Sequence, residues 1–229
     1  GKAAGAYMWG NEIANCSKLY VMRNAVDAQA FQFNKNIRTE FRKNFGFENR
    51  TIIGHIGRFN EQKNHSFLIE IFKEYLALDP TAFLVLIGIG ELEPKIRNLV
   101  NRSEIQSNVI FLGQRNDVRE LYNTFDVFLL PSLYEGLPVV GIEAQANGLP
   151  CLFSDTISDE VVILPGTKVL KLSDSAQIWA DTIRELVNKK TIDRAKAIDV
   201  INAAGYNIEV EAEKLRKYYF AEVTERKRK

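Results

Sequence analysis

The stretch TIIGHIGRFNEQKNHSFLIEIFKEYLALDPTAFLVLIGIG, residues 51–90, holds two short apolar runs separated by a longer amphipathic segment. The runs at 52–56 and 82–87 have the length of β-strands and are apolar except at His55, which is typical of strands buried on both faces. The segment 64–78 repeats apolar residues at helical spacing. A strand, a helix and a second strand in this order predict a right-handed crossover between parallel strands.

The same alternation continues along the chain. Further strand-length runs lie at 109–112, 127–130 and 149–153, with a shorter one at 168–172. Helical patterns lie at 38–44, 92–102, 118–125 and 138–147, and then at 176–189, 192–204 and 209–221. The fold class predicted is therefore α/β, a doubly wound parallel sheet covered on both faces and followed by C-terminal helices.

The composition is that of a globular protein, with 46% hydrophobic and 26% charged residues and a net charge of +1. A balanced charge provides no global field for a nucleic acid or a bilayer, so no nucleic-acid partner is expected. No apolar run approaches the ~18 residues of a membrane span, and no signal peptide is visible, which predicts a cytoplasmic protein. The basic run 225–229 is expected to be solvated; contact with the inner face of a membrane is the alternative.

Two features argue against structural cross-links and metal sites. Cys16 and Cys151 lie far apart and no CxxC spacing occurs, so neither a disulfide framework nor a zinc site is expected. His55 ends a predicted strand and His65 begins a predicted helix, where core or capping roles are favoured over catalysis. No metal ligands are therefore predicted.

Ligands of an open parallel sheet bind at the carboxyl ends of the strands, so the loops there are the candidate sites. The first loop is GRFNEQKN, in which Gly57 allows close backbone approach and Arg58 and Lys63 can bracket a diphosphate. The alternative is surface charge with Asn64 capping the next helix. After the second strand, GIGE contains only part of a dinucleotide fingerprint, and a tight turn is favoured over NAD binding.

The loop after the fourth strand, PSLYEGLPVVGIEA at 131–144, carries the strongest signal. Pro138 suits the first turn of a helix, whose free N–H groups around Val139 and Val140 would form an anion site with the helix dipole. Glu135 and Glu143 repel phosphate and are expected to bind hydroxyl groups, those of a sugar and a ribose. The alternative is that both are ordinary solvated or paired acids.

Four blocks in this order resemble one known family. PSLYEGLPVVGIEA resembles the E-x7-E signature of the GT4 family of retaining glycosyltransferases, and GRFNEQKNH resembles its donor-phosphate loop. VIFLGQRNDV (109–118) resembles the segment near the nucleotide base, and VMRNAVDAQAF (21–31) resembles the interdomain linker. The segment HIGRFNEQKNHSFLIEIF is similar in sequence to segments of bacterial capsular and exopolysaccharide glycosyltransferases. The resemblance extends over nearly the whole chain.

The resemblance implies a role for each matching residue. Arg58 and Lys63 would hold the diphosphate, Glu135 would position the sugar, and Glu143 would bind the ribose hydroxyls. Arg115 would lie near the base. The donor would also be contacted by the backbone of the loop and the helix start, namely Gly57, Gly136, Leu137, Pro138, Val139 and Val140. The family transfers sugar with retention and without a metal or other cofactor, most often from a UDP-sugar in this type of enzyme.

The resemblance also implies a division of the chain. Residues 1–30 would be a remnant of an N-terminal acceptor domain with the linker, 31–205 the Rossmann-like nucleotide-sugar-binding domain of a GT-B fold, and 206–229 a C-terminal helix and basic tail. The N-terminal domain and a saccharide or lipid-linked acceptor are the implied partners, so the chain alone is expected to be incomplete as an enzyme. Two alternatives stay open: a UDP-sugar 2-epimerase and a non-catalytic nucleotide-sugar-binding module.

Overall fold

The computed structural model of the chain describes residues 24–189 and 193–226, together with the isolated positions 6–8, 10, 12, 16 and 22. A six-stranded sheet forms its centre, with the strand order β3-β2-β1-β4-β5-β6 and every pair parallel. The strands are β1 (Ile52–Ile56), β2 (Phe83–Ile87), β3 (Val109–Gly113), β4 (Val127–Leu130), β5 (Cys151–Ser154) and β6 (Lys168–Leu170). The predicted α/β fold with a doubly wound parallel sheet is confirmed.

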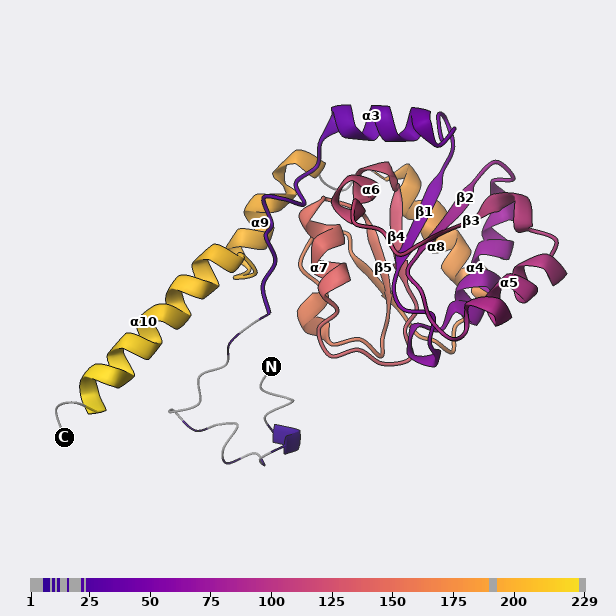
Figure 1. Cartoon of the computed structure of the whole chain (residues 1–229). Helices are drawn as coiled ribbons and strands as arrows, with labels where there is room; N and C mark the ends of the chain where they lie inside the picture. The colour runs from indigo at the N-terminus through magenta and orange to yellow at the C-terminus, as the bar shows by residue number, and fades with distance from the viewer. Residues whose placement is uncertain are drawn as a thin grey trace.

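Helices cover both faces of this sheet (Figure 1). The α-helices described are α3 (Lys35–Asn44), α4 (His65–Leu78), α5 (Glu93–Arg102), α6 (Val118–Thr124), α7 (Val139–Ala146), α8 (Ala176–Asn188), α9 (Ala197–Ala203) and α10 (Ile208–Arg226), the last of which does not cover the sheet. Alternate residues of the strands belong to different cores. Leu84 and Leu86 pack with α4, α5 and α8, whereas Val85 and Ile87 pack in the core that includes α6, α7 and α9. This alternation explains why most strand positions are apolar.

The strand order creates a switch point between β1 and β4. β2 pairs with one side of β1, and β3 follows on the far side of β2. β4 then pairs with the other side of β1. The loops that leave the carboxyl ends of β1 and β4 lead to helices on opposite faces of the sheet, α4 on one and α7 on the other. Open α/β sheets bind ligands at such a switch point.

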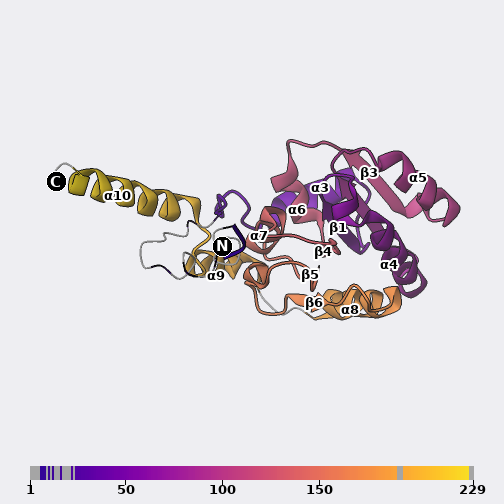
Figure 2. The same cartoon turned by 90° about the horizontal axis from the view of Figure 1, so that it is seen from below.

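The C-terminal helix α10 extends away from the sheet (Figure 2). Its start is held by the segment before α3, because Val26 donates to Tyr206 O and accepts from Ile208 N, at 2.9 and 3.0 Å. The domain limits predicted at 30/31 and 205/206 would place Val26 in the N-terminal remnant, and Tyr206 and Ile208 in the C-terminal segment. These limits stay a prediction. Residues 227–229 of the basic tail lie outside the described residues.

Most element boundaries agree with the sequence-based ones within two residues, and three differ by more. The helix expected from 38 begins at Lys35, because the side chain of Asn34 caps it by accepting from Asn36 N and Ile37 N. The helix expected at 192–204 is a 3-10 turn at Arg194–Lys196 followed by α9. α10 continues five residues beyond the expected 221. The sequence also favours a short strand at 18–22 and the end of a helix at 2–10. Residues 18–21 and most of 2–10 lie outside the described residues.

Candidate functional site

The loops after β1 and β4 are joined side by side at the carboxyl edge of the sheet. Leu133 N donates to Gln62 O at 2.8 Å, and Gln62 Nε2 donates to Tyr134 O at 2.9 Å. Asn64, whose backbone is left-handed with φ of 53°, donates its side-chain amide to Pro131 O at 3.1 Å. Asn64 thus precedes α4 without capping it by its side chain, contrary to the capping alternative. These hydrogen bonds hold the two loops in a fixed relation across the switch point.

Lys63 and Glu135 meet where the two loops touch. Lys63 Nζ lies 2.5 Å from Glu135 Oε1, and the two side chains are only 13% and 11% exposed. Ser132 Oγ donates to the same carboxylate oxygen at 3.2 Å. The stem of Lys63 crosses directly over Gly57, because a Cβ placed there would lie 3.0 Å from Lys63 Cδ and Cε. A Cβ at position 57 would therefore require the lysine stem to shift by a few tenths of an ångström.

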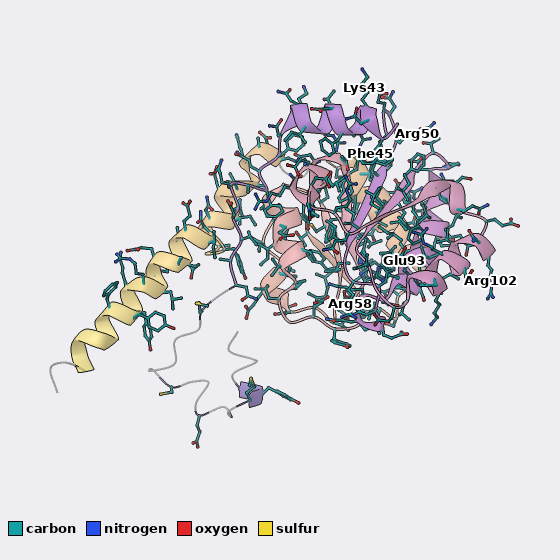
Figure 3. The ribbon with its side chains drawn as sticks, in the orientation of Figure 1. Lys43, Phe45, Arg50, Arg58, Glu93 and Arg102 are labelled. Carbon is teal, nitrogen blue, oxygen red and sulfur yellow. The ribbon has the colours of Figure 1, made fainter. Side chains whose placement is uncertain are left out.

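Arg58 lies at the same edge but is held loosely. It contacts Glu91 at 3.2 Å, and both side chains are mostly exposed, at 71% and 58%. Figure 3 shows Arg58 at the end of the domain opposite to Lys43, Phe45 and Arg50. An exposed ion pair of this kind contributes little to stability, so Arg58 can exchange Glu91 for a ligand anion at low cost. The structure therefore couples Lys63 to Glu135 and leaves Arg58 available.

The start of α7 presents free backbone donors next to Glu135. The helix begins at Val139 with Pro138 at the N-cap position, one residue later than expected. Within the described residues, the N–H groups of Gly136, Leu137, Val139 and Val140 donate to no other backbone group. Glu135 itself is anchored by an isolated bridge to Ile157. Unpaired N–H groups at a helix start favour an anion.

Glu143 lies on α7 and is half-buried. Burial raises the pKa of its carboxyl group, while the hydroxyl of Tyr122 and the charge of Arg119 act in the opposite direction. Tyr122 Oη lies 2.9 Å from Glu143 Oε2. Arg115, predicted to lie near a base, forms an ion pair with Asp117 at 2.5 Å before the start of α6. Among the described residues, its hydrogen bonds go to Asp117 and not to the other predicted site residues.

Sequence reasoning missed four side chains that support the site: Gln62, Asn64, Ser132 and Tyr122. Each acts through a contact with a residue far along the chain or across a loop. Gln62, Asn64 and Ser132 lie within the two loops that the sequence singles out, and Tyr122 lies outside them. Among these four residues, only Asn64 gave a signal in the local sequence, because asparagine tolerates a left-handed backbone better than most residue types.

Both histidines are buried beneath Lys63 in contact with each other. The ring centroids of His55 and His65 lie 4.7 Å apart, and Phe59 stacks on His65 at 4.2 Å. His55 Nδ1 lies 2.9 Å from Leu129 O. Burial lowers the pKa of His65 to about 4 and that of His55 well below 6.5, with the positive charge of Lys63 contributing to both. The imidazoles are therefore neutral core groups at neutral pH, as expected from the sequence.

This burial makes stability depend on pH in a defined direction. In the unfolded chain His65 titrates near 6.5, so between that value and about 4 the unfolded state binds more protons than the folded state. The stability present above pH 6.5 is lost as the pH falls toward 4. From pH 7 to pH 5, we expect the wild type to lose about 2 kcal/mol more free energy of unfolding than His65→Gln. Urea denaturation of both proteins at both pH values measures this, and equal losses would contradict it.

A cavity of about 700 Å³ lies at the opposite edge of the sheet, beside Arg38, Asp126 and Arg194. Its arginines are already engaged. Arg194 donates to the carbonyl groups of Tyr122, Phe125 and Asn147, and Arg38 donates to three carbonyl groups at the end of α6 and to Asp126. These contacts satisfy the C-terminal carbonyls of α6 and α7. The cavity is separate from the site at the switch point.

No group of three or more His, Cys, Asp and Glu side chains in the described part of the chain is arranged to hold a metal ion. None of the helices described there has both the length and the apolarity needed to cross a bilayer.

Comparison with known sequences identifies relatives of this chain. The family profile "Glycosyl transferases group 1" matches residues 36–203. A putative glycosyltransferase, EpsF, from Bacillus subtilis (strain 168) is 39% identical over 185 residues, which cover 80% of this chain and 48% of the relative. An Escherichia coli UDP-Gal:alpha-D-GlcNAc-diphosphoundecaprenol alpha-1,3-galactosyltransferase is 35% identical over 144 residues, 60% of this chain and 37% of that protein. The chain thus spans about half the length of the Bacillus relative.

Solved structures confirm the fold. Anabaena HepE in complex with UDP-glucose superposes with a TM-score of 0.80 at 18% identity, over 96% of this chain and 61% of HepE. The C-terminal domain of LpcC, a group 1 family protein from Francisella tularensis, superposes with a TM-score of 0.67 at 21% identity, over 80% of this chain and 99% of that domain. Since the profile match includes both loops of the site and the sheet between them, the chain belongs to the group 1 glycosyl transferases.

Proposed function

We propose that this chain is the donor-binding portion of a retaining glycosyltransferase that uses a nucleotide-diphosphate sugar, with a UDP-sugar favoured. The sugar would pass to a saccharide or lipid-linked acceptor held by an N-terminal domain. The observation that carries this proposal is the contact between Lys63 and Glu135 at the switch point, which brings a cation and a hydroxyl-binding acid to one spot.

The arrangement suits a diphosphate flanked by two groups of hydroxyls. Lys63, Arg58 and the free N–H groups at the start of α7 would share the diphosphate oxygens. Glu135 would accept from hydroxyls of the sugar, and Glu143 from those of the ribose. Because Glu135 is already neutralised by Lys63, its negative charge repels the diphosphate less than an isolated carboxylate would. Arg115 would lie toward the base.

The same groups would act in the transfer step. As the bond between the anomeric carbon and the diphosphate breaks, negative charge builds on the leaving oxygen. Preorganised cations and N–H donors beside that oxygen stabilise it without first having to reorient, and such electrostatic stabilisation is usually the largest catalytic contribution. Lys63 is held in place by its loop, and Arg58 would complete the clamp by leaving Glu91. Two cations of this kind can take the part that a divalent metal plays elsewhere, so metal-independent binding is proposed.

The names of the relatives support the donor and acceptor classes. The E. coli relative is named for a UDP-Gal donor and a diphosphoundecaprenol-linked acceptor, and HepE was solved with UDP-glucose. Retention follows from the resemblance of the E-x7-E block. The burial of His55 and His65 disfavours the epimerase, which needs a histidine among the acid/base groups around the sugar. The intact set of Arg58, Lys63, Glu135 and Glu143 disfavours a non-catalytic module.

Isothermal titration with UDP tests the donor site. We expect Arg58→Ala and Glu143→Ala each to weaken binding at least roughly tenfold, equivalent to about 1.4 kcal/mol. Arg184→Ala is the matched control, because Arg184 forms an exposed ion pair with Asp181 on α8, as Arg58 does with Glu91. The affinity of this control should equal that of the wild type. Titrations with GDP and ADP test the preference for uracil, and a titration in EDTA tests metal independence. Unchanged UDP affinity in both site variants would refute the proposal.

A further inference from the structure

Tyr122 is a fully buried tyrosine whose hydroxyl group reaches from α6 to α7. Its Oη lies 2.9 Å from Glu143 Oε2 and 3.0 Å from Val140 O. The ring packs against those of Phe31, Phe125 and Phe128, with centroids 5.7, 6.1 and 5.9 Å away. Because the ring is enclosed on these sides, its hydroxyl oxygen has one available position.

This fixed oxygen restricts the carboxyl group of Glu143. A hydroxyl donates one proton at a time, and an ionised carboxylate is a stronger acceptor than the carbonyl of Val140. When Oε2 accepts that proton, the plane of the carboxylate is set, and Oε1 is left without a hydrogen-bond donor among the described residues. A glutamate in the second turn of a helix otherwise has several rotamers open to it, and only some of them would direct the carboxylate at one ligand.

We propose that Tyr122 is a positioning residue for nucleotide binding, which holds Glu143 in the one orientation that accepts the ribose hydroxyls of the donor. This inference rests on the proposed role of Glu143. Tyr122 touches no part of the ligand and acts only through the carboxylate. The advantage is preorganisation: the rotamer is selected before the ligand arrives, so binding does not have to order it.

The hydrogen bond also affects the charge of Glu143. Burial raises the pKa of this carboxyl group, and the Tyr122 hydroxyl and Arg119, both on α6, lower it again. On β5, which also packs against α7, burial raises the pKa of the Cys151 thiol, so it carries no charge at neutral pH. The charged residue of α9, Asp199, is exposed. Removal of the Tyr122 hydroxyl should therefore raise the pKa of Glu143.

Comparison of two ligands with Tyr122→Phe separates positioning from a structural role. We expect about fivefold weaker binding of UDP and unchanged binding of 2′,3′-dideoxyuridine 5′-diphosphate, which lacks the hydroxyls that Glu143 would accept. Equal weakening of both ligands, or no change in either, would overturn the proposal. Tyr75→Phe is the matched control, because it removes an equally buried hydroxyl that bonds to Thr51 at the other end of β1. It should change neither affinity.

The pH profile of UDP binding gives a second readout. A protonated Glu143 accepts fewer hydrogen bonds, so affinity should fall as the pH drops through its pKa. Relative to the wild type, Tyr122→Phe should lose UDP affinity at a higher pH, and an identical profile would count against positioning. If Glu143→Ala binds UDP normally, the proposed role of Glu143 is wrong, and if Arg58→Ala does so as well, the proposed donor site itself is wrong. If Glu143→Ala binds weakly while Tyr122→Phe behaves as the wild type with both ligands, only the inference about Tyr122 fails.

Discussion

Gly88→Ala is expected to lower the free energy of unfolding by about 4 kcal/mol and to abolish UDP binding. Two costs add. Gly88 has φ of +138°, a backbone conformation that residues with a side chain rarely adopt. A Cβ there would also lie 2.0 Å from Gly57 O and 2.9 Å from Gly57 C, so the backbone of the neighbouring loop after β1 would have to move. That loop carries Arg58 and Lys63, which links the loss of stability to a loss of ligand binding.

Urea denaturation and UDP titration of Gly88→Ala measure both effects. Gly46→Ala is the matched control, because Gly46 also has positive φ, at +68°, but has open space where the Cβ would be. It lies beside Phe45, at the opposite end of the domain from Arg58 (Figure 3). We expect it to lose only about 1 kcal/mol, from backbone strain, and to bind UDP normally. Equal free energies of unfolding of the two variants would show that the close approach of a Cβ at position 88 to the backbone of Gly57 does not lower stability.

Lys63→Met is expected to weaken UDP binding by roughly 30-fold, or about 2 kcal/mol, while keeping most of the stem that covers Gly57. It should also lower the free energy of unfolding by about 2 kcal/mol, because the mostly buried carboxylate of Glu135 loses its counter-charge. Titration with UDP and urea denaturation measure the two losses separately.

The double variant Lys63→Met/Glu135→Gln tells the two roles of Lys63 apart. Glu135→Gln removes the unpaired charge, so stability should return to within about 1 kcal/mol of the wild type. UDP affinity should stay low, since no cation is restored. Binding by the double variant as tight as by the wild type would show that Lys63 serves only to neutralise Glu135 and takes no part in holding the diphosphate.

The glycines at 88 and 90 illustrate where a sequence motif and a structure diverge. The sequence predicts a tight turn there and disfavours a dinucleotide site, but it does not show why both positions lack side chains. A Cβ at Gly90 would lie 2.4 Å from Phe59 O, so each glycine makes room for the backbone of the loop after β1. The spacing of the two glycines therefore reflects packing between loops that are 30 residues apart in the chain, which no local pattern encodes.

The strands and their buried character could be predicted because they depend on local composition. A run such as 127–130 is apolar at every position since its residues face two cores, and its limits match β4 without correction. The position of the candidate site could also be predicted, because parallel strands place their loops at one edge. Where a boundary was misjudged, as at α3 and α9, a capping side chain or a 3-10 turn decided it.

The sequence by itself determined the fold class, the family and the edge of the sheet at which chemistry can occur, since periodicity and motif order are properties of the chain. Only the tertiary structure decided which charges meet. Lys63 pairs with Glu135 across 72 positions because β1 and β4 are neighbours, whereas Arg58, five residues earlier, points to Glu91. Likewise Tyr122 reaches Glu143 only because α6 and α7 pack on the same face of the sheet. Strand order sets such contacts, and strand order follows from the packing of the whole domain.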